Sequence, residues 1–344
     1  MESITIKDVA RLCGVGVSTV SRAINNHPDI NPETKEKIMQ VISEHHYIPN
    51  NSARNLKRQD SKTVAILMKG IANPFFHEMI KILEYEVEKK KYSFLLHHVE
   101  EDEDEIDVAM ELEKEKKLCG IVFLGGTVGH TEEKFRQLTT PFVLCTIGLR
   151  HDVNPAIGSS VSIDDVKEAR RMVSYLCSLG HERIAFVAAR EDDIAIGRMR
   201  LEGYRQALEE NHIPFRPELV LYPEKGMNAY SMANGYQVTK RFLDSNIPAT
   251  AFFAISDNVS FGVCKAIYDA GKRIPEDYSV AGFDGIEMGK YYSPTLTTMR
   301  QPCEEMARET MKILFSRIED EKGNKHKVFE AELQEGGSVR RIKA

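Results

Sequence analysis

Two short helical patterns open the chain, within residues 5–25. In both of them, apolar side chains recur at the three- and four-residue spacing of one helix face: Val9, Ala10, Cys13, Val20 and Ile24. A break at Gly14-Val15-Gly16 separates the two patterns. Neither pattern is long enough to form a stable helix alone, because nucleating a helix is costly. The spacing therefore predicts two helices that pack through their apolar stripes, as in a helix-turn-helix.

The second pattern also has a polar face, on which hydrogen-bonding side chains recur: Ser18, Ser21, Arg22 and Asn25. A short helix of this kind fits the DNA major groove, with its N-terminal residues at the base edges. Arg22 is the most informative member, because a guanidinium can donate two hydrogen bonds to one guanine. An ordinary helical hairpin with a solvated face would show the same spacing, so the pattern alone leaves both interpretations open.

A third helix is predicted to begin near residue 32. Asn31 and Pro32 suit the cap and the first position of a helix. Its apolar stripe consists of Ile38, Val41 and Ile42. The three stripes together are sufficient for a minimal three-helix core.

From Thr63 onward the pattern changes to short apolar runs that alternate with amphipathic helices. The runs form two series of four: 64–68, 94–96, 120–124 and 142–144, then 184–187, 219–221, 251–254 and 280–283. Continuously apolar strands that alternate with helices are typical of a parallel sheet covered on both faces. The two series therefore predict two doubly wound α/β lobes.

The length and composition fit a soluble protein of two or three domains. The chain has 344 residues, of which 42% are hydrophobic and 28% charged, as in ordinary globular proteins. It shows no basic start followed by an apolar run, and no stretch near the roughly 20 apolar residues that span a bilayer. We therefore expect a cytoplasmic protein without membrane contact.

No motif in the chain supports an enzyme. It has no dinucleotide-binding fingerprint, no G-x-S-x-G elbow and no zinc-ligand spacing, so we predict no catalytic residue, metal or cofactor. The six cysteines form no C-x-x-C pair, which favours buried reduced thiols over disulfides or metal ligands. Gly125–Gly129 resembles a phosphate-binding loop but lacks the following lysine. The acidic run Glu100–Glu105 is typical of a solvated helix surface.

The net charge of −6 is not carried by the first 60 residues. They contain eight Lys and Arg against seven Asp and Glu. Because affinity for DNA depends strongly on cationic contacts to phosphates, a single copy of this region should bind DNA weakly. Two copies on one palindromic site would bind better, which favours a homodimer; a tetramer stays open as an alternative.

The first 56 residues resemble the head of the lactose-repressor (LacI/GalR) family of bacterial transcriptional regulators. The resemblance lies in Asp8-Val9-Ala10, Gly14-Val15, Thr19–Asn25, Tyr47–Asn50, Ala53-Arg54 and Leu56, and it continues through nearly the whole chain. It implies that the helix-turn-helix binds operator DNA. The positions that it assigns to DNA are Val17, Ser18, Thr19, Ser21, Arg22, Asn25, Asn50, Ala53, Arg54, Leu56 and Lys57.

Residues 49–60 match the hinge of that family, which folds into a helix on DNA and enters the minor groove. Leu56 stands where the family has a leucine that wedges into a central base step and bends the duplex. Arg54 and Lys57 would then lie near phosphates. Composition alone, polar apart from Ala53 and Leu56, favours a plain interdomain linker, and Leu56 together with the resemblance reverses that preference.

The resemblance also implies the domain organisation. It predicts a three-helix head at residues 1–48, the hinge at 49–60, and a two-lobed core like that of periplasmic binding proteins at 61–344. The predicted N-lobe comprises about 61–161 and 293–321, and the predicted C-lobe about 162–291 and 326–340. The chain should cross between lobes near 160–164, 291–294 and 322–326. Ligands of such sheets bind at the carboxyl ends of the strands, which places a cleft between the lobes.

Four strand-end stretches carry side chains suited to contact an effector in that cleft: Phe75 and Phe76, Arg198 and Arg200, Ser256 and Asn258, and Asp284. Arg200 matches a family position that reaches effector hydroxyls or carboxylates. Asp284 matches an acidic residue that accepts hydrogen bonds from the effector, and it is the strongest candidate. Core packing for the phenylalanines, surface ion pairs for the arginines and helix capping for Ser256 and Asn258 are the alternative roles.

The chain departs from the family pattern at the start of the second helix. Gly16 replaces a capping residue, and Val17 and Ser18 are small side chains with little hydrogen-bonding reach. A contact from Val17 to a thymine methyl group is compatible with this. The departure moves the expected sequence specificity toward Arg22 and Leu56.

The resemblance implies a homodimeric repressor that binds a palindromic operator and is switched by a small molecule in the cleft, a sugar or sugar derivative. Movement of the lobes would change the spacing of the two hinges. The runner-up is a regulator of the same fold controlled by a protein corepressor, as in the catabolite-control branch of the family. A free solute-binding protein would need an export signal and no DNA-binding head, so we set it aside.

Overall fold

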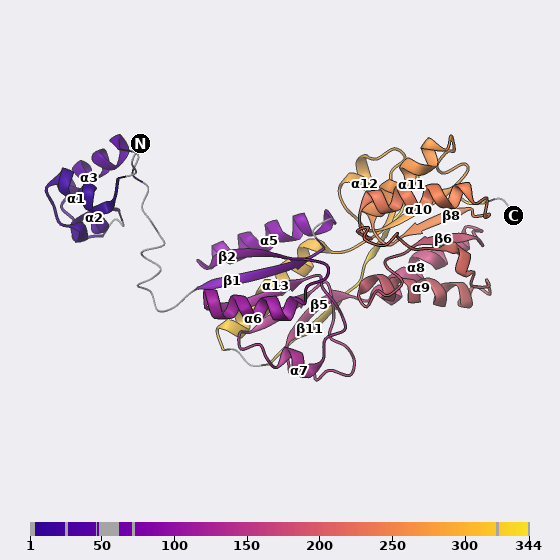
Figure 1. Ribbon diagram of the computed structural model, residues 1–344, viewed down its shortest axis with the longest axis horizontal. Helices are drawn as coiled ribbons and strands as arrows, with labels where there is room; N and C mark the ends of the chain where they lie inside the picture. Colours follow the sequence, from indigo (N-terminus) through magenta and orange to yellow (C-terminus); the bar gives the residue numbers. More distant parts are fainter. Residues whose placement is uncertain are drawn as a thin grey trace. The chain divides into compact units, whose positions relative to one another are not determined.

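The computed structural model describes residues 4–24, 27–45, 47, 62–70, 73–320 and 323–342. The chain divides into two compact units, Met1–Ser61 and Lys62–Ala344 (Figure 1). Each unit has its own hydrophobic core.

The first unit contains the three predicted helices, α1 (Ile6–Cys13), α2 (Val17–Ile24) and α3 (Pro32–Glu44). Local chemistry sets their ends. Thr5 and Asp8 form a capping box before α1, and Gly14 ends it with a φ of 71°. The side chain of Asn31 accepts hydrogen bonds from two amides of α3.

The three apolar stripes meet in one small core. Its buried members are Val9, Ala10, Cys13, Val20, Ala23 and Ile38. Ile24, Val41 and Ile42 pack against this group and are half-buried. The predicted helix-turn-helix head is therefore confirmed, with Ala23 as a core member that the pattern did not single out.

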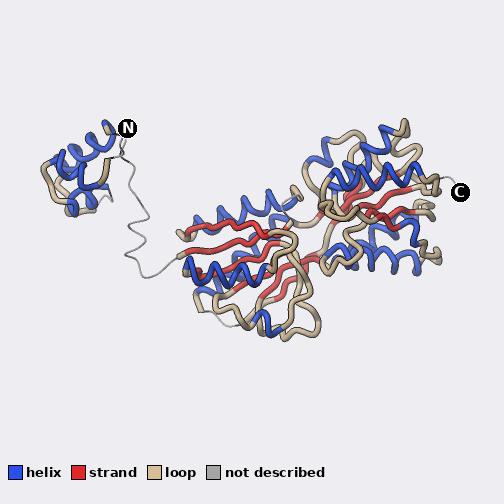
Figure 2. The backbone as a smooth tube through the Cα atoms, in the orientation of Figure 1, coloured by secondary structure: helices blue, strands red, loops and turns tan. Residues whose placement is uncertain are grey.

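The second unit consists of two α/β lobes, each with one six-stranded sheet. Figure 2 shows the two sheets as separate groups of strands, each flanked by helices. The N-lobe sheet has the order β11-β5-β4-β3-β1-β2 and is parallel throughout. Its strands are β1 (Thr63–Lys69), β2 (Ser93–Val99), β3 (Leu118–Leu124), β4 (Phe142–Cys145), β5 (Ser159–Ile163) and β11 (His326–Phe329). Its helices are α5 (Phe75–Lys89), α6 (Glu105–Lys116), α7 (Glu132–Phe135) and α13 (Cys303–Ile318).

Strand β1 shows why its sequence is apolar without alternation. Val64, Ile66 and Met68 belong to the core under α5 and α13, whereas Ala65 and Leu67 belong to the core under α6 and α7. Successive side chains of a strand point to opposite faces. A strand buried on both faces therefore needs apolar residues at every position.

The C-lobe sheet has the order β12-β10-β9-β8-β6-β7. Its strands are β6 (Ile184–Val187), β7 (Val220–Leu221), β8 (Ala251–Ala254), β9 (Ser279–Asp284), β10 (Thr297–Arg300) and β12 (Glu332–Gln334). Its helices are α8 (Asp165–Ser178), α9 (Ile196–Glu210), the 3-10 helix η1 (Pro217–Leu219), α10 (Met232–Asp244), α11 (Asp257–Asp269) and α12 (Met288–Tyr291). The expectation of purely parallel sheets needs one correction, because the edge strand β12 runs antiparallel to β10.

The chain crosses between the lobes three times, but two crossings lie further along the chain than predicted. The first, between β5 and α8, falls at residue 164, as expected. The second follows β10, since β10 still belongs to the C-lobe sheet and α13 packs on the N-lobe. The third lies between β11 and β12. The predicted boundaries near 293 and 326 are corrected to 301–302 and 330–331.

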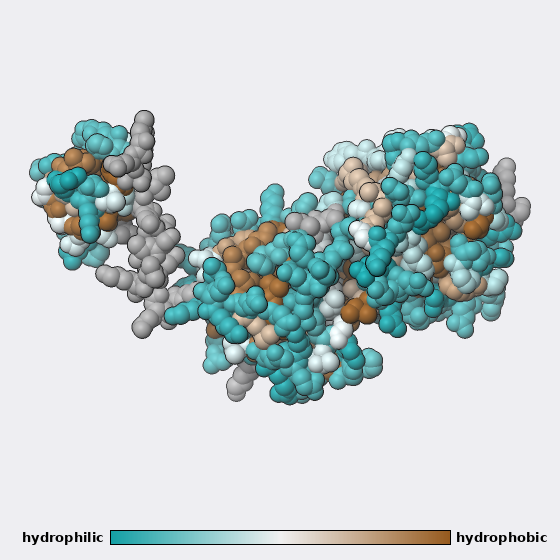
Figure 3. Space-filling model, viewed as in Figure 1, coloured by the Kyte–Doolittle hydropathy of each residue, from teal (hydrophilic) through white to brown (hydrophobic). Residues whose placement is uncertain are grey.

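Within the described ranges, no helix is long and apolar enough to cross a membrane. The six cysteines are unpaired, with Cys13, Cys145 and Cys264 buried and the other three half-buried. Figure 3 shows a mainly hydrophilic surface in this view, with hydrophobic residues gathered over β1 and β2, between α5 and α6.

Candidate effector site and DNA-binding helix

The polar face of α2 is open to solvent. Val17 is 42% exposed, Ser18 and Arg22 are exposed, and Thr19 and Ser21 are half-buried. The backbone carbonyl of Gly16 accepts hydrogen bonds from the amides of Thr19 and Val20. Because glycine has no side chain, Gly16 cannot add a side-chain cap to the start of α2. The remaining predicted DNA contacts, at Asn25, Asn50, Ala53, Arg54, Leu56 and Lys57, lie outside the described residues.

A cavity of about 350 Å³ opens between the two lobes, within the size range of small-molecule sites. Strand-end loops form it, after β1, β2, β3 and β4 on one side and after β6 and β7 on the other. Its lining includes Lys69, Asn73, Phe76, Thr127, Ile147, Asp192, Asp193, Ile194, Ile196 and Tyr230. The exposed surface of the cavity is mainly apolar, and the polar and charged side chains of its lining could orient a ligand.

Hydrogen bonds join the lobes beside this cavity. The side-chain amide of Asn73 donates to Oδ2 of Asp284 at 2.8 Å. The backbone amide of Val128 donates to the carbonyl of Ile194 at 3.3 Å. Both bonds connect loops that line or adjoin the cavity, so a bound molecule there would act directly on the contact between the lobes.

Asp284 and Arg200 lie in a buried polar network at the end of β9. Oδ1 of Asp284 accepts a hydrogen bond from Gln301 at 2.8 Å and lies 3.5 Å from Nη1 of Arg200. Burial raises the pKa of the Asp284 carboxyl, and the charge of Arg200 opposes this rise. Asp284 does not line the cavity; its partner Asn73 does. The structure thus gives Asp284 a role in joining the lobes.

Arg200 is 1% exposed and is held on all sides. Its Nε donates to Asp165 at 2.8 Å, its Nη1 donates to the carbonyl of Ile255, and its guanidinium lies 3.6 Å from the ring centroid of Phe283. Burial raises the pKa of Asp165 to about 6, although the charge of Arg200 opposes the rise. Arg200 therefore supports the C-lobe end of the network rather than lining the cavity.

The other predicted effector residues separate into different roles. Both Phe75 and Phe76 belong to the core under α5, and Phe76 also lines the cavity. Arg198 is exposed and outside the cavity lining. Ser256 caps α11 by accepting from the amide of Val259 at 3.3 Å.

Asn258 and Tyr230 form a connected pair. The side-chain amide of Asn258 donates to the backbone carbonyl of Tyr230 at 2.8 Å. It thereby fixes the loop from which Tyr230 reaches the cavity. The hydroxyl of Tyr230 is buried and has no hydrogen-bond partner among the described residues. Since buried polar groups are normally paired, a ligand could supply the hydrogen-bond partner of this hydroxyl.

The sequence did not identify Tyr230, Asp193 or Lys69 as site residues. Tyr230 precedes Ser231, the cap of α10, in the loop that follows β7. This is the strand-end position that revealed the other candidates, but β7 has only two residues and gives a weak signal. Oδ2 of Asp193 accepts a hydrogen bond from the amide of Arg198 at 2.9 Å, and burial raises the pKa of Asp193.

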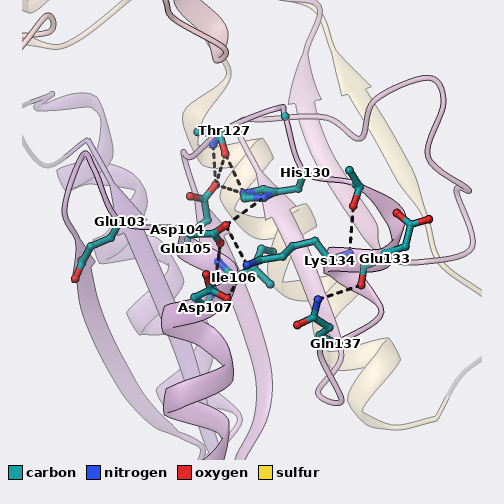
Figure 4. Close-up of polar contacts among 12 residues, drawn as sticks. Glu103, Asp104, Glu105, Ile106, Asp107, Thr127, His130, Glu133, Lys134 and Gln137 are labelled. Atoms are coloured by element: carbon teal, nitrogen blue, oxygen red, sulfur yellow. Dashed lines mark hydrogen bonds and ion pairs between the residues drawn. The ribbon is translucent and has the colours of Figure 1, made fainter.

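The end of the acidic run corrects the expectation of a solvated surface. Glu105 is 3% exposed, at the start of α6. Figure 4 shows its carboxylate among Thr127, His130 and Asp104. It accepts from the amide of Thr127 at 2.7 Å and from Nε2 of His130 at 2.8 Å, and it pairs with Nζ of Lys69 at 3.2 Å.

A helix-turn-helix head joined to two doubly wound lobes with a cleft between them defines a ligand-controlled DNA-binding regulator. Residues 5–50 match the bacterial regulatory proteins of the lacI family, and residues 173–339 match the periplasmic binding protein-like domain. The chain belongs to the lacI family of bacterial transcriptional regulators.

Proteins similar to this chain match it along nearly its whole length. The transcriptional regulator MalR of Clostridium butyricum is 39% identical over 97% of this chain and 98% of its own. Catabolite control protein A of Streptococcus mutans is 33% identical over 91% of each chain. The solved structure of the regulator CelR in complex with cellobiose has 27% identity and a TM-score of 0.70, covering 97% of this chain and 99% of that one.

Proposed function

We propose that this regulator is a repressor whose operator affinity is set by a sugar in the interlobe cavity. The observation that carries the proposal is the cavity itself, because both lobes line it and the Asn73–Asp284 bond joins them at its edge. A ligand shifts an equilibrium only by the difference in its affinity for the two states. A molecule that touches both lobes meets this requirement.

The lining suits a sugar. Phe76, Ile147 and Ile194 offer apolar surface to the C–H faces of a pyranose ring. Asp193 and the unpaired hydroxyl of Tyr230 offer partners to its hydroxyl groups. Two related regulators have been solved with sugars: CelR with cellobiose, and a LacI-family regulator from Enterococcus faecium with ribose at 28% identity.

The regulator would read a palindromic operator as a homodimer in the cytoplasm. Its exposed face on α2 fits the major groove, with Val17, Ser18 and Arg22 toward the bases and Thr19 and Ser21 beside them. The proposed hinge at 49–60 would add the minor-groove contacts of Asn50, Ala53, Arg54, Leu56 and Lys57. The edge strand β2 presents an apolar surface, including Leu96, that supports pairing with a second copy.

Titration calorimetry of the full-length protein with sugars and nucleosides tests the effector proposal, followed by gel shifts on an operator selected from random DNA. We expect one sugar to bind and to change operator affinity by about 5- to 150-fold. Binding of a nucleoside and of no sugar would reject a sugar as the effector. If no small molecule binds and a phosphorylated carrier protein changes operator affinity instead, the corepressor alternative replaces the proposal.

A further inference from the structure

The charged groups of the cavity do not favour an anionic ligand. Two cations line it, Lys69 and Arg190, together with three carboxylates, Glu101, Asp192 and Asp193. Arg190 is paired with Asp192 through hydrogen bonds of 3.0 and 2.9 Å. That leaves Lys69 as the lining cation that could compensate an anionic group of a ligand.

The charge of Lys69 is already paired with groups of the chain that do not line the cavity. Its Nζ donates to the carbonyl of Glu103 at 2.6 Å and to Oε2 of Glu105 at 3.2 Å. These bonds use two of the three ammonium hydrogens. The carboxylate of Glu105 is shielded from solvent, so water weakens its attraction for Lys69 much less than at the surface.

Glu105 also occupies the loop that resembles a phosphate-binding loop. The amide and the hydroxyl of Thr127 both donate to Oε1 of Glu105, at 2.7 and 3.0 Å (Figure 4). Gly126 permits this approach, because a Cβ atom there would lie 2.6 Å from the same oxygen. A carboxylate of the chain itself therefore stands where the loop would otherwise offer its donors to a phosphate.

We infer that Glu105 makes the cavity selective for an uncharged sugar over its phosphate ester. A phosphate next to Lys69 would find the lysine already paired and would lie near the carboxylates of Glu101 and Asp193 without a cation of its own. A buried charge without a partner costs at least about tenfold in affinity. The inference rests on the proposed function, since it specifies which kind of sugar the cavity accepts.

Titration calorimetry on the full-length protein tests this with matched pairs: glucose and glucose 6-phosphate, cellobiose and cellobiose 6′-phosphate. We expect the neutral member of the binding pair to bind at least about tenfold more tightly than its phosphate ester. A phosphate ester that binds as tightly as the neutral sugar would overturn the inference while supporting a sugar site. If neither pair binds, the sugar that binds in the panel and its phosphate ester replace them, and a panel without any binding sugar would reject the proposed function and this inference with it.

The variant Glu105→Gln tests the cause of the selectivity. Glutamine keeps the shape and an acceptor for the Thr127 amide but releases the charge of Lys69, so the affinity ratio of phosphate ester to neutral sugar should rise at least about tenfold. Asp102→Asn removes one charge from an exposed position of the same run and should leave the ratio unchanged. An unchanged ratio in Glu105→Gln, or an equal rise in Asp102→Asn, would overturn the inference.

Adding Lys69→Met to the Glu105→Gln variant should return the ratio toward that of the wild type, because the released cation is then removed. Circular dichroism melts confirm that each variant is folded. If Glu105→Gln does not fold, the wild-type ratio of the matched pairs decides the inference.

Discussion

The side-chain amide of Asn73 donates to the carboxylate of Asp284 at 2.8 Å, from one lobe to the other. Both residues are buried, so water does not compete for this bond. Asp284 has a φ of 115°, a backbone region that costs a non-glycine residue about 1–3 kcal/mol. The surrounding bonds must compensate this strain, which makes Asp284 sensitive to any change in the arrangement of the lobes.

The variant Asp284→Ala should abolish the response to the effector while leaving effector-free operator binding intact. It removes the shared acceptor of Asn73 and Gln301, whereas the head folds around its own core. Gel shifts with and without the bound sugar measure the response. Asp277→Ala, at a surface ion pair with Arg273, is the matched control. A normal response in Asp284→Ala would remove this carboxylate from the coupling.

The stability contributed by Glu105 should depend on pH. Burial alone would raise the pKa of its carboxyl, but hydrogen bonds from His130 and Thr127 and the charge of Lys69 lower it to about 2. A carboxyl whose folded pKa lies below its unfolded pKa stabilises the fold above the unfolded pKa, and this stabilisation is lost as pH falls toward the folded pKa. The full contribution at pH 7 is on the order of 3 kcal/mol.

Urea unfolding of the wild type and Glu105→Gln measures this effect between pH 7 and pH 4. The gap in free energy of unfolding should be constant down to about pH 5 and then narrow, by about 1 kcal/mol at pH 4. Glu115→Gln, at an exposed carboxylate, should show no such change. A gap that stays constant to pH 4 would contradict the lowered pKa.

The apolar runs predicted the strands whose two faces are both buried, such as β1, β6 and β8. They did not reveal β5 or β10, because Ser159–Ile163 and Thr297–Arg300 are rich in Ser and Thr. These polar strands belong to the sheets through backbone pairing on both sides, β5 with β4 and the distant β11, and β10 with β9 and β12. For this reason the apolar pattern predicts the second crossing between the lobes too early in the chain.

The site shows the same limit. The strand-end rule and the resemblance predicted Phe76, Arg200 and Asp284 as effector contacts, but they did not indicate that Arg200 and Asp284 face each other inside the C-lobe. Glu105 could not be separated from the acidic run around it. Its burial depends on Gly126, which lies 21 residues further along the chain and comes close only in the folded state.

Arg22→Ala should weaken specific operator binding by about 1–3 kcal/mol and relax the preference for one base pair in each half-site. Binding to unrelated DNA should change little. Competition gel shifts with operator and non-operator duplexes measure the ratio. A uniform loss on both duplexes would make Arg22 a phosphate contact instead of a base contact.

Leu56→Ala tests the proposed minor-groove wedge. If Leu56 opens a base step, its truncation should weaken operator binding and reduce DNA bending, with sugar affinity unchanged. Gel shifts with circularly permuted operator fragments report both affinity and bending. Unchanged affinity together with unchanged bending would favour a plain linker at residues 50–59.

Tyr230→Phe should separate ligand binding from stability. The hydroxyl of Tyr230 is buried without a partner among the described residues, so its removal should leave the free energy of unfolding unchanged or slightly raised. If the sugar is the missing partner, its affinity should fall by about 1 kcal/mol, or roughly fivefold. Calorimetry and urea unfolding on the same protein samples measure the two quantities.

Tyr204→Phe is the matched control for this prediction. The hydroxyl of Tyr204 donates to the carbonyl of Ile184 at 2.9 Å, inside the C-lobe and away from the cavity lining. Its removal should lower the free energy of unfolding by about 1 kcal/mol and leave sugar affinity unchanged. The two variants should thus show opposite patterns, because the hydroxyl of Tyr204 has its hydrogen-bond partner in the fold and that of Tyr230 would have it in the ligand. A loss of stability without loss of affinity in Tyr230→Phe would place its hydroxyl in the fold.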